Sequence, residues 1–166
     1  RYLTELNPYL HQRNRVLFPW LPEQPLTLPG LNFRGLSPDR LVSPEAPFAF
    51  SVGDRSFVAL ALSGAEGSDN LVLWLPDEGI LFSGDFFGPL FPQFPNIFTM
   101  RGEKTRRPFE FMRAIDQILA LQPTTLLPSH GSVVSGSDYI ASNMLRIRDA
   151  IGWVHDQTVS AMNAGI

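Results

Sequence analysis

The sequence predicts an α/β layered domain, because short apolar segments patterned as strands are followed by a helix, another strand and a long helix. The chain has 166 residues, of which 44% are apolar and 17% charged, as expected for one globular domain or a large piece of one. Residues 1–47 differ from the remainder because they contain eight of the fifteen prolines. We therefore expect a Pro-rich wrapping segment over residues 1–47 and the α/β domain over residues 48–166.

Four strands are expected at the start of the α/β domain. The first two flank Gly53-Asp54, a strong signal for a two-residue hairpin turn. The next two are joined by Pro76-Asp77-Glu78-Gly79, whose composition is typical of a turn. These strands are predicted over residues 49–52, 56–62, 71–75 and 80–82.

Helices and one further strand are expected after the four strands. Pro108 suits the first position of a helix that runs to about Leu121, and Pro123 would end it. Residues 124–127 are predicted as a buried strand. Ser137 or Asp138 can cap a long final helix, and Gly165 can end it. Its apolar face is expected to comprise Ile140, Met144, Ile147, Ile151, Val154 and Met162.

The Pro-rich segment is expected to form extended loops rather than long helices or central strands. Proline fixes φ and lacks a backbone donor, so its frequency here disfavours both regular structures. One short helix is expected near residues 3–15. Leu17, Phe18, Trp20 and Leu21 argue against free disorder, because such apolar residues require a surface to cover.

Composition narrows the classes of function. The net charge of −3 and the pI near 5.5 give no support for nucleic acid or an anionic membrane as partner. No window approaches the 18 or more apolar residues that span a bilayer. The chain contains no cysteine, which excludes disulfides, thiolate metal ligands and a cysteine nucleophile from within this sequence.

Three polar groups stand where predicted strands end. Asp85 follows the apolar segment ending in Ser83-Gly84, and His130 follows Leu126-Leu127-Pro128-Ser129. Glu66 lies between two strands, although Asp69 could take its place. Carboxylate and imidazole together suit zinc or a similar ion. Each residue also has a plain structural alternative, since any strand can end in a turn residue that bonds to the backbone.

Several ordered motifs then resemble one known family. Ser83-Gly84-Asp85 and Pro128-Ser129-His130-Gly131 resemble metal-ligating segments of the metallo-β-lactamase superfamily. Three further motifs are similar to the alkylsulfatase-like branch of hydrolases, and the resemblance covers roughly residues 56–166. These motifs lie at residues 95–102, 148–151 and 154–158. The resemblance implies the C-terminal half of an αβ/βα sandwich, a mixed sheet covered by helices.

The resemblance also implies a role for each site residue. Glu66, Asp85 and His130 would ligate two zinc ions, with Asp85 bridging them, and metal-activated hydroxide would attack a sulfate ester or similar anionic ester. Asn96 and Arg101 would bind the anionic group. At the position of Asp85 the alkylsulfatases proper resemble Ala-Glu-Asn, whereas this chain agrees with the wider superfamily.

The family's first metal motif, His-x-His-x-Asp-His, is absent from the sequence. The other two histidines, His11 and His155, are isolated, and His155 is expected as a packed helix residue. The sequence opens at Arg1 without an initiator methionine or a signal-peptide pattern, so we expect a removed leader or missing upstream sequence. An N-terminal half, cleaved from the same precursor or missing, would have to complete the enzyme, and the chain alone is expected to be inactive.

Alternatives remain open at this stage. The chain could be another enzyme on the same fold, such as a lactonase, thioesterase or phosphodiesterase, or a non-catalytic remnant used in binding or assembly. Arg106 and Arg107 either enlarge an anion-attracting rim or form a solvated helix start with an acidic partner nearby. A Phe/Pro loop could wall an alkyl pocket, pack between halves of the fold, or form a homodimer contact. Its aromatic residues are Phe86, Phe87, Phe91, Phe94 and Phe98.

Overall fold

The computed structural model of the chain describes residues 38–62, 67, 70–87, 91–95 and 107–166. The chain divides into two compact units, and the second comprises Val42–Ile97 and Arg106–Ile166. Every described strand and helix belongs to this second unit. Of the first unit, only residues 38–41 are described, so the wrapping segment and its boundary at residue 47 remain predictions.

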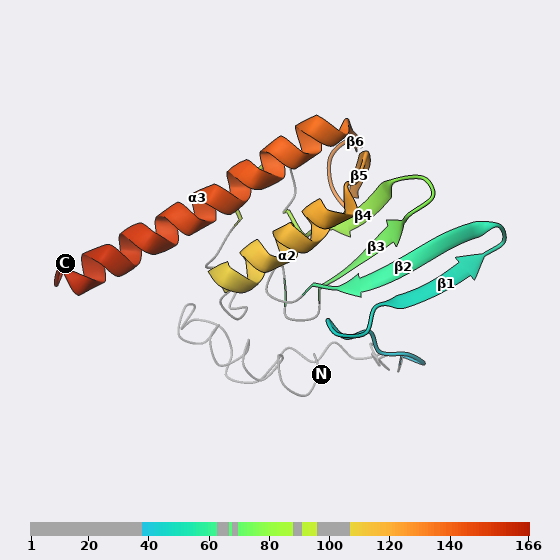
Figure 1. Cartoon of the computed structure of the whole chain (residues 1–166), viewed down its shortest axis with the longest axis horizontal. Coiled ribbons are helices and arrows are strands. Elements are labelled where there is room, and N and C mark those ends of the chain that lie inside the picture. The colour runs from blue at the N-terminus through green and yellow to red at the C-terminus, as the bar shows by residue number, and fades with distance from the viewer. Residues whose placement is uncertain (1–37, 63–66, 68–69, 88–90, 96–106) are drawn as a thin grey trace, which may run out of the picture. The chain divides into compact units, whose positions relative to one another are not determined.

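A six-stranded mixed sheet forms the centre of the second unit (Figure 1). The strands lie in sequence order, so each is hydrogen-bonded to the next along the chain. All neighbours are antiparallel except β4 and β5, which are parallel. The strands are β1 (Phe48–Val52), β2 (Arg55–Ala61), β3 (Leu71–Leu75), β4 (Ile80–Gly84), β5 (Thr125–Pro128) and β6 (Val134–Ser135).

The strand predictions are confirmed to within one or two residues, with β6 as the exception. Val52 pairs with Arg55, so Gly53-Asp54 forms the expected two-residue turn. The second pair, β3 and β4, is antiparallel as well. Sequence reasoning missed β6, because two residues are too few to show a strand periodicity.

Two helices cover one face of the sheet (Figure 1). Helix α2 (Pro108–Leu121) connects β4 to β5, and helix α3 (Ser137–Asn163) follows β6. Their buried residues form a single core with alternate residues of the strands, because successive side chains of a strand point to opposite faces. This core includes Trp74, Leu81 and Leu126 of the sheet, and Ile115 and Met144 of the helices. The predicted α/β layered architecture is confirmed.

The opposite face of the sheet is also apolar, but its side chains are more exposed. Phe50 pairs with Phe57 across β1 and β2, and their rings stack at 5.2 Å between centroids. Leu73 pairs with Phe82 on the same face. The Phe82 side chain is 41% exposed, whereas its neighbour Leu81, which faces the helices, is fully buried.

Helix α2 begins and ends as the prolines predict. Pro108 occupies its first turn, and the C-cap residue Gln122 adopts a left-handed conformation just before Pro123. The guanidinium of Arg107 lies 2.7 Å from the Glu110 carboxylate, which provides the acidic partner expected at this helix start. Arg148 of α3 lies 2.6 Å from the Asp116 carboxylate of α2, and hydrogen bonding and charge from Asp116 raise the pKa of Arg148.

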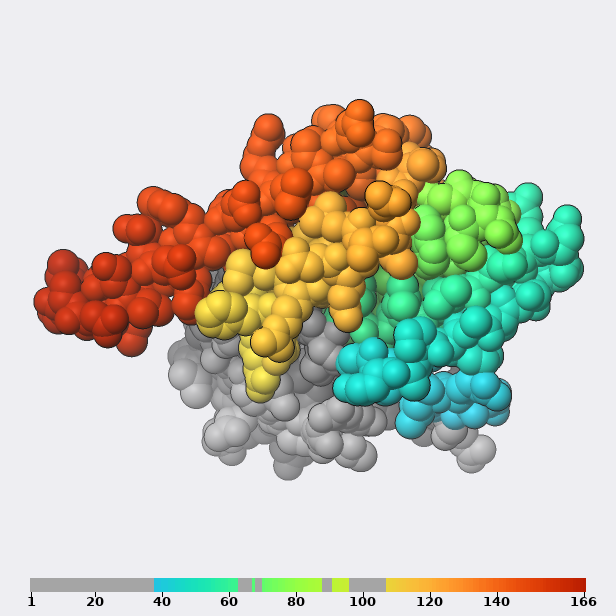
Figure 2. Space-filling model, viewed as in Figure 1, coloured from blue at the N-terminus to red at the C-terminus, as the bar shows by residue number. Residues whose placement is uncertain are grey.

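Helix α3 corrects two predictions. Its N-cap residue is Gly136 and makes no side-chain capping bond, so the expected cap by Ser137 or Asp138 is wrong. The apolar stripe is buried only as far as Ile151, while Val154 and Met162 are 43% and 68% exposed. The last turns of α3 extend beyond α2 (Figure 2), so α2 does not reach the end of the stripe.

The C-terminal end of α3 is closed as expected near Gly165. The N–H of Ile166 donates to the carbonyl of Ala161, and the N–H of Gly165 donates to Met162. These two bonds form a Schellman motif, which satisfies carbonyl groups that the helix leaves unpaired. Among the described residues, no helix is long and apolar enough to cross a membrane.

The beginning of the Phe/Pro loop belongs to the core. Phe86 and Phe87 are 1% and 2% exposed, and Phe86 lies 5.0 Å from the ring of Phe111 in α2. Phe91 packs against Phe87, whereas Phe94 is exposed. Phe86 and Phe87 therefore serve as packing between sheet and helix, and Phe98 lies outside the described residues.

Candidate metal site

The candidate site lies where two neighbouring parallel strands end. Because β4 and β5 are adjacent and parallel, their carboxyl ends meet at the same edge of the sheet. Asp85 directly follows β4, and Ser129-His130 directly follow β5. The fold therefore brings together two residues that are 45 positions apart in the sequence.

Gly84 shapes the turn that carries Asp85. Its φ of 56° lies in the left-handed region, which favours glycine over residues with a Cβ atom. The strand register shifts at this point, so that Gly84 pairs with Pro128. The N–H of Ser129 then donates to the Gly84 carbonyl at 3.1 Å. The two loops are thus joined by a backbone hydrogen bond in addition to the contacts between their side chains.

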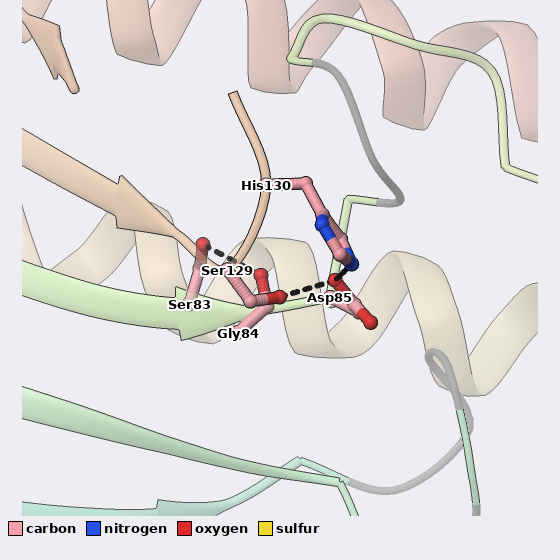
Figure 3. Close-up of polar contacts among 5 residues, drawn as sticks. All are labelled: Ser83, Gly84, Asp85, Ser129 and His130. Carbon is pink, nitrogen blue, oxygen red and sulfur yellow. Dashed lines mark hydrogen bonds and ion pairs between the residues drawn. The ribbon is translucent and has the colours of Figure 1, made fainter. Parts of the chain in front are cut away.

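The side chains of Asp85 and His130 point toward each other (Figure 3). His130 Nε2 lies 3.5 Å from Asp85 Oδ1. The Ser129 hydroxyl donates a hydrogen bond to the same carboxylate oxygen. Asp85 and His130 are 42% and 61% exposed, so water and ions can reach both groups.

This geometry fits a shared zinc ion. Zinc binds carboxylate oxygen and histidine nitrogen at about 2.0–2.2 Å with tetrahedral angles, which places two such ligand atoms about 3.4 Å apart. The observed separation of 3.5 Å between Nε2 and Oδ1 matches that value. Carboxylate and imidazole are also ligand types that zinc accepts. Asp85 and His130 therefore have the chemistry and the spacing that a shared zinc ion would require.

The other predicted site residues cannot be placed. Glu66, Asn96 and Arg101 all lie outside the described residues, as do Asp69 and Arg106. Within the described ranges, no group of three or more His, Asp or Glu side chains could hold a metal ion. Glu66 as a ligand, and Asn96 and Arg101 as anion-binding residues, consequently remain predictions.

His155 is located away from the strand ends, on α3. Its ring lies 4.4 Å from the ring of Phe109 in edge-to-face geometry, and its Nδ1 lies 3.0 Å from Asp156 Oδ1. The side chain is 26% exposed. This arrangement agrees with the expectation of a packed helix histidine.

Sequence reasoning missed Ser129 as part of the site. Its hydroxyl contacts Asp85, 44 positions earlier, through the pairing of β4 with β5. The only sequence signal is its position directly before His130. That signal gains meaning only after the parallel pairing of the two strands is known.

The chain was compared with known proteins. It is 38% identical over 102 residues to a linear primary-alkylsulfatase from Pseudomonas sp., an alignment that covers 61% of this chain and 19% of that protein. The expected resemblance to alkylsulfatases is confirmed. No family model matches the chain.

Solved structures confirm the fold. The stereoselective inverting sec-alkylsulfatase Pisa1 from Pseudomonas sp. superposes with a TM-score of 0.64 at 21% identity, covering 76% of this chain and 20% of that one. A metallo-β-lactamase family protein from Thermus thermophilus gives a TM-score of 0.50 at 19% identity, covering 70% and 36%. The predicted metallo-β-lactamase-like architecture is therefore confirmed. The chain spans about a fifth of the length of its alkylsulfatase relatives, at 19% and 20%.

Proposed function

We propose that this chain is part of a dinuclear zinc-dependent hydrolase that acts on sulfate esters or similar anionic esters. The observation that carries the proposal is the convergence of Asp85 and His130 at the ends of adjacent parallel strands. The similarity to a primary and a secondary alkylsulfatase favours sulfate esters within that class.

Each site residue has a definite task under this proposal. His130, Asp85 and Glu66 would hold the two ions, with one imidazole and two carboxylates as ligands. Asn96 and Arg101 bind the anionic group of the substrate, because a guanidinium offers a bidentate donor fork and an amide adds a neutral donor. When bound, the ions would supply Lewis acidity and lower the pKa of water toward neutrality.

An N-terminal half of the same fold is the partner that this site requires. The sequence contains three histidines and lacks the upstream His-x-His-x-Asp-His motif, so it holds too few ligands for two ions. The sheet face opposite the helices supports such a partner, because it carries apolar side chains that stay partly exposed. Phe82 at 41% and Leu71 at 48% exposure are examples. Burying this face would add to the stability of the complete protein.

The decisive experiment uses the full-length product of the open reading frame that encodes this chain. We expect it to contain the missing histidine motif, bind about two zinc ions per chain, and release inorganic sulfate from a medium-chain alkyl sulfate. A carboxylic ester and a lactone serve as alternative substrates. Arg101→Ala should raise KM for the sulfate ester by at least about tenfold, because the charged group of the substrate loses a bidentate partner.

Three outcomes would contradict the proposal in distinguishable ways. Turnover of the lactone or the carboxylic ester, with no sulfate release, would identify another hydrolase on this fold. An open reading frame without the histidine motif would overturn the two-ion site. Absence of both bound zinc and activity in the full-length protein would indicate a non-catalytic remnant.

A further inference from the structure

Ser129 contacts the loop that carries Asp85 at two points. Its N–H donates to the Gly84 carbonyl at 3.1 Å, and its hydroxyl donates to Asp85 Oδ1. We propose that Ser129 is a positioning residue, which holds the Asp85 carboxylate in the orientation that ligates metal. This inference rests on the proposed function and adds to it a residue that the metal-ligand set does not contain.

Asp85 needs such a partner because its side chain is open to solvent. At 42% exposure the carboxylate is not fixed by packing, so an unbonded side chain would sample several rotamers. A hydrogen bond from a hydroxyl to an ionised carboxylate is stronger than one between neutral groups. Ser129 can therefore hold the carboxylate in place before any ion binds, which improves affinity by reducing the ordering that binding requires.

The hydrogen bond leaves Asp85 able to ligate metal. An ionised carboxylate has about four lone-pair positions, and the Ser129 hydroxyl occupies only one of them. Oδ1 still faces His130 Nε2 at 3.5 Å. Both contacts that the described residues make with the carboxylate are to Oδ1, and none of these residues is hydrogen-bonded to Oδ2.

The same geometry argues against a nucleophilic role for Ser129. In a Ser-His-Asp triad, the serine hydroxyl bonds to one imidazole nitrogen and the aspartate holds the other. Here the hydroxyl and the imidazole both approach the same oxygen of Asp85. The Ser129 hydroxyl therefore donates its hydrogen bond to the carboxylate rather than to the imidazole, which differs from the arrangement that activates a serine nucleophile.

Zinc affinity of the full-length protein tests the inference. Ser129→Ala should weaken zinc binding about tenfold in competition with a chromophoric chelator, which is the lower range for loss of a group that orients a metal ligand. Ser129→Thr keeps the hydroxyl and should stay within about threefold of the wild type. The cobalt(II)-substituted Ser129→Ala protein should show altered visible absorption bands, since the ligand geometry changes. The urea midpoint of unfolding of the metal-free protein should stay the same, because metal then adds nothing to stability.

Two further variants make the result decisive. Ser142→Ala is the matched control, because Ser142 is an exposed serine of α3 whose hydroxyl donates to the carbonyl of Tyr139. It should change neither zinc affinity nor the cobalt spectrum. His130→Ala removes a predicted ligand and therefore shows whether zinc binds at this site.

The outcomes separate the inference from the proposed function. Weaker zinc binding in His130→Ala with wild-type binding in Ser129→Ala would overturn the positioning role and leave the metal site intact. A loss of both affinity and stability in Ser129→Ala, not rescued by Ser129→Thr, would show a structural role instead. Unchanged zinc binding in His130→Ala would overturn the proposed site, and the role of Ser129 with it.

Discussion

The β4–β5 pair has a glycine carbonyl that accepts backbone N–H groups at each of its two ends, but the surroundings of the two ends differ. At the strand starts, the carbonyl of Gly79 accepts the N–H groups of Thr124 and Thr125 at 2.9 and 3.1 Å. At the strand ends, the carbonyl of Gly84 accepts the N–H of Ser129 at 3.1 Å. Both glycines have positive φ, at 68° and 56°. In each case a left-handed glycine aims its carbonyl across to the neighbouring strand.

The surroundings of the two glycines differ. A Cβ atom on Gly79 would lie 2.7 Å from Thr124 Oγ1, whereas a Cβ atom on Gly84 would meet no atom of the described residues within 4 Å. The strand starts are therefore closely packed, and the strand ends are open and carry an exposed carboxylate and imidazole. The strand starts thus hold the parallel pair in register, and the strand ends carry the two predicted metal ligands.

Removing either ligand at the open end should have the largest effect. A four-ligand structural zinc site contributes about 10–16 kcal/mol in total, so one ligand contributes about 2.5–4 kcal/mol, or a factor of about 70 to 900 in affinity. We expect Asp85→Ala and His130→Ala to weaken zinc binding of the full-length protein by that factor, with a comparable loss of activity. Isothermal titration with zinc measures it.

Stability of the metal-free protein provides the control for the ligand variants. Both side chains are substantially exposed, so their removal should change the free energy of unfolding by no more than about 0.5 kcal/mol. A large loss of stability in the absence of metal would show that the Asp85–His130 contact is structural, and would weaken the distinction between the two ends.

The glycine pair should show the opposite pattern. Gly79→Ala places an L residue in the left-handed region, at a cost of about 1–2 kcal/mol, and forces its Cβ against Thr124, for an expected total of about 2–3 kcal/mol. Gly84→Ala pays only the conformational part, about 1–2 kcal/mol. Urea unfolding of the metal-free protein measures both. Equal losses for the two variants would mean that packing at the strand starts is no tighter.

Most of the sheet could be predicted from local chemistry. Gly53-Asp54 and the turn ending in Gly79 set the strand limits, and Pro108 with Pro123 set those of α2. The failures have physical reasons. The N-terminus of α3 is fixed by Gly136, whose φ of 105° cannot be read from neighbouring side chains. The exposed stretch of α3 looks like core in sequence, because periodicity does not reveal where the facing helix begins.

The convergence of Asp85 and His130 could be predicted from the sequence for a similar reason. Asp85 and His130 stand out because an apolar strand stops abruptly at each, and the parallel pairing of β4 and β5 then brings them together. Ser129 does not stand out in the sequence in this way. It contacts Asp85 only because β4 is the strand that lies beside β5. The metal-binding roles of Asp85, His130 and Glu66 came from the resemblance and remain predictions. The same holds for the anion-binding roles of Asn96 and Arg101.

Removing one hydroxyl at each end of the β4–β5 pair should give the smallest effects and tests whether the two ends act independently. The Thr124 hydroxyl donates to the Gly79 carbonyl at 3.2 Å, and that carbonyl already accepts two backbone N–H groups. Thr124→Val keeps the side-chain shape. Because Thr124 is exposed, removing its hydroxyl leaves no buried polar group unpaired, so we expect the free energy of unfolding to fall by only about 0.5 kcal/mol. Zinc affinity should not change, whereas Ser129→Ala should alter affinity without altering stability. A measurable loss of zinc affinity in Thr124→Val would show that the two ends are coupled through the parallel strands, because this variant leaves every predicted ligand in place.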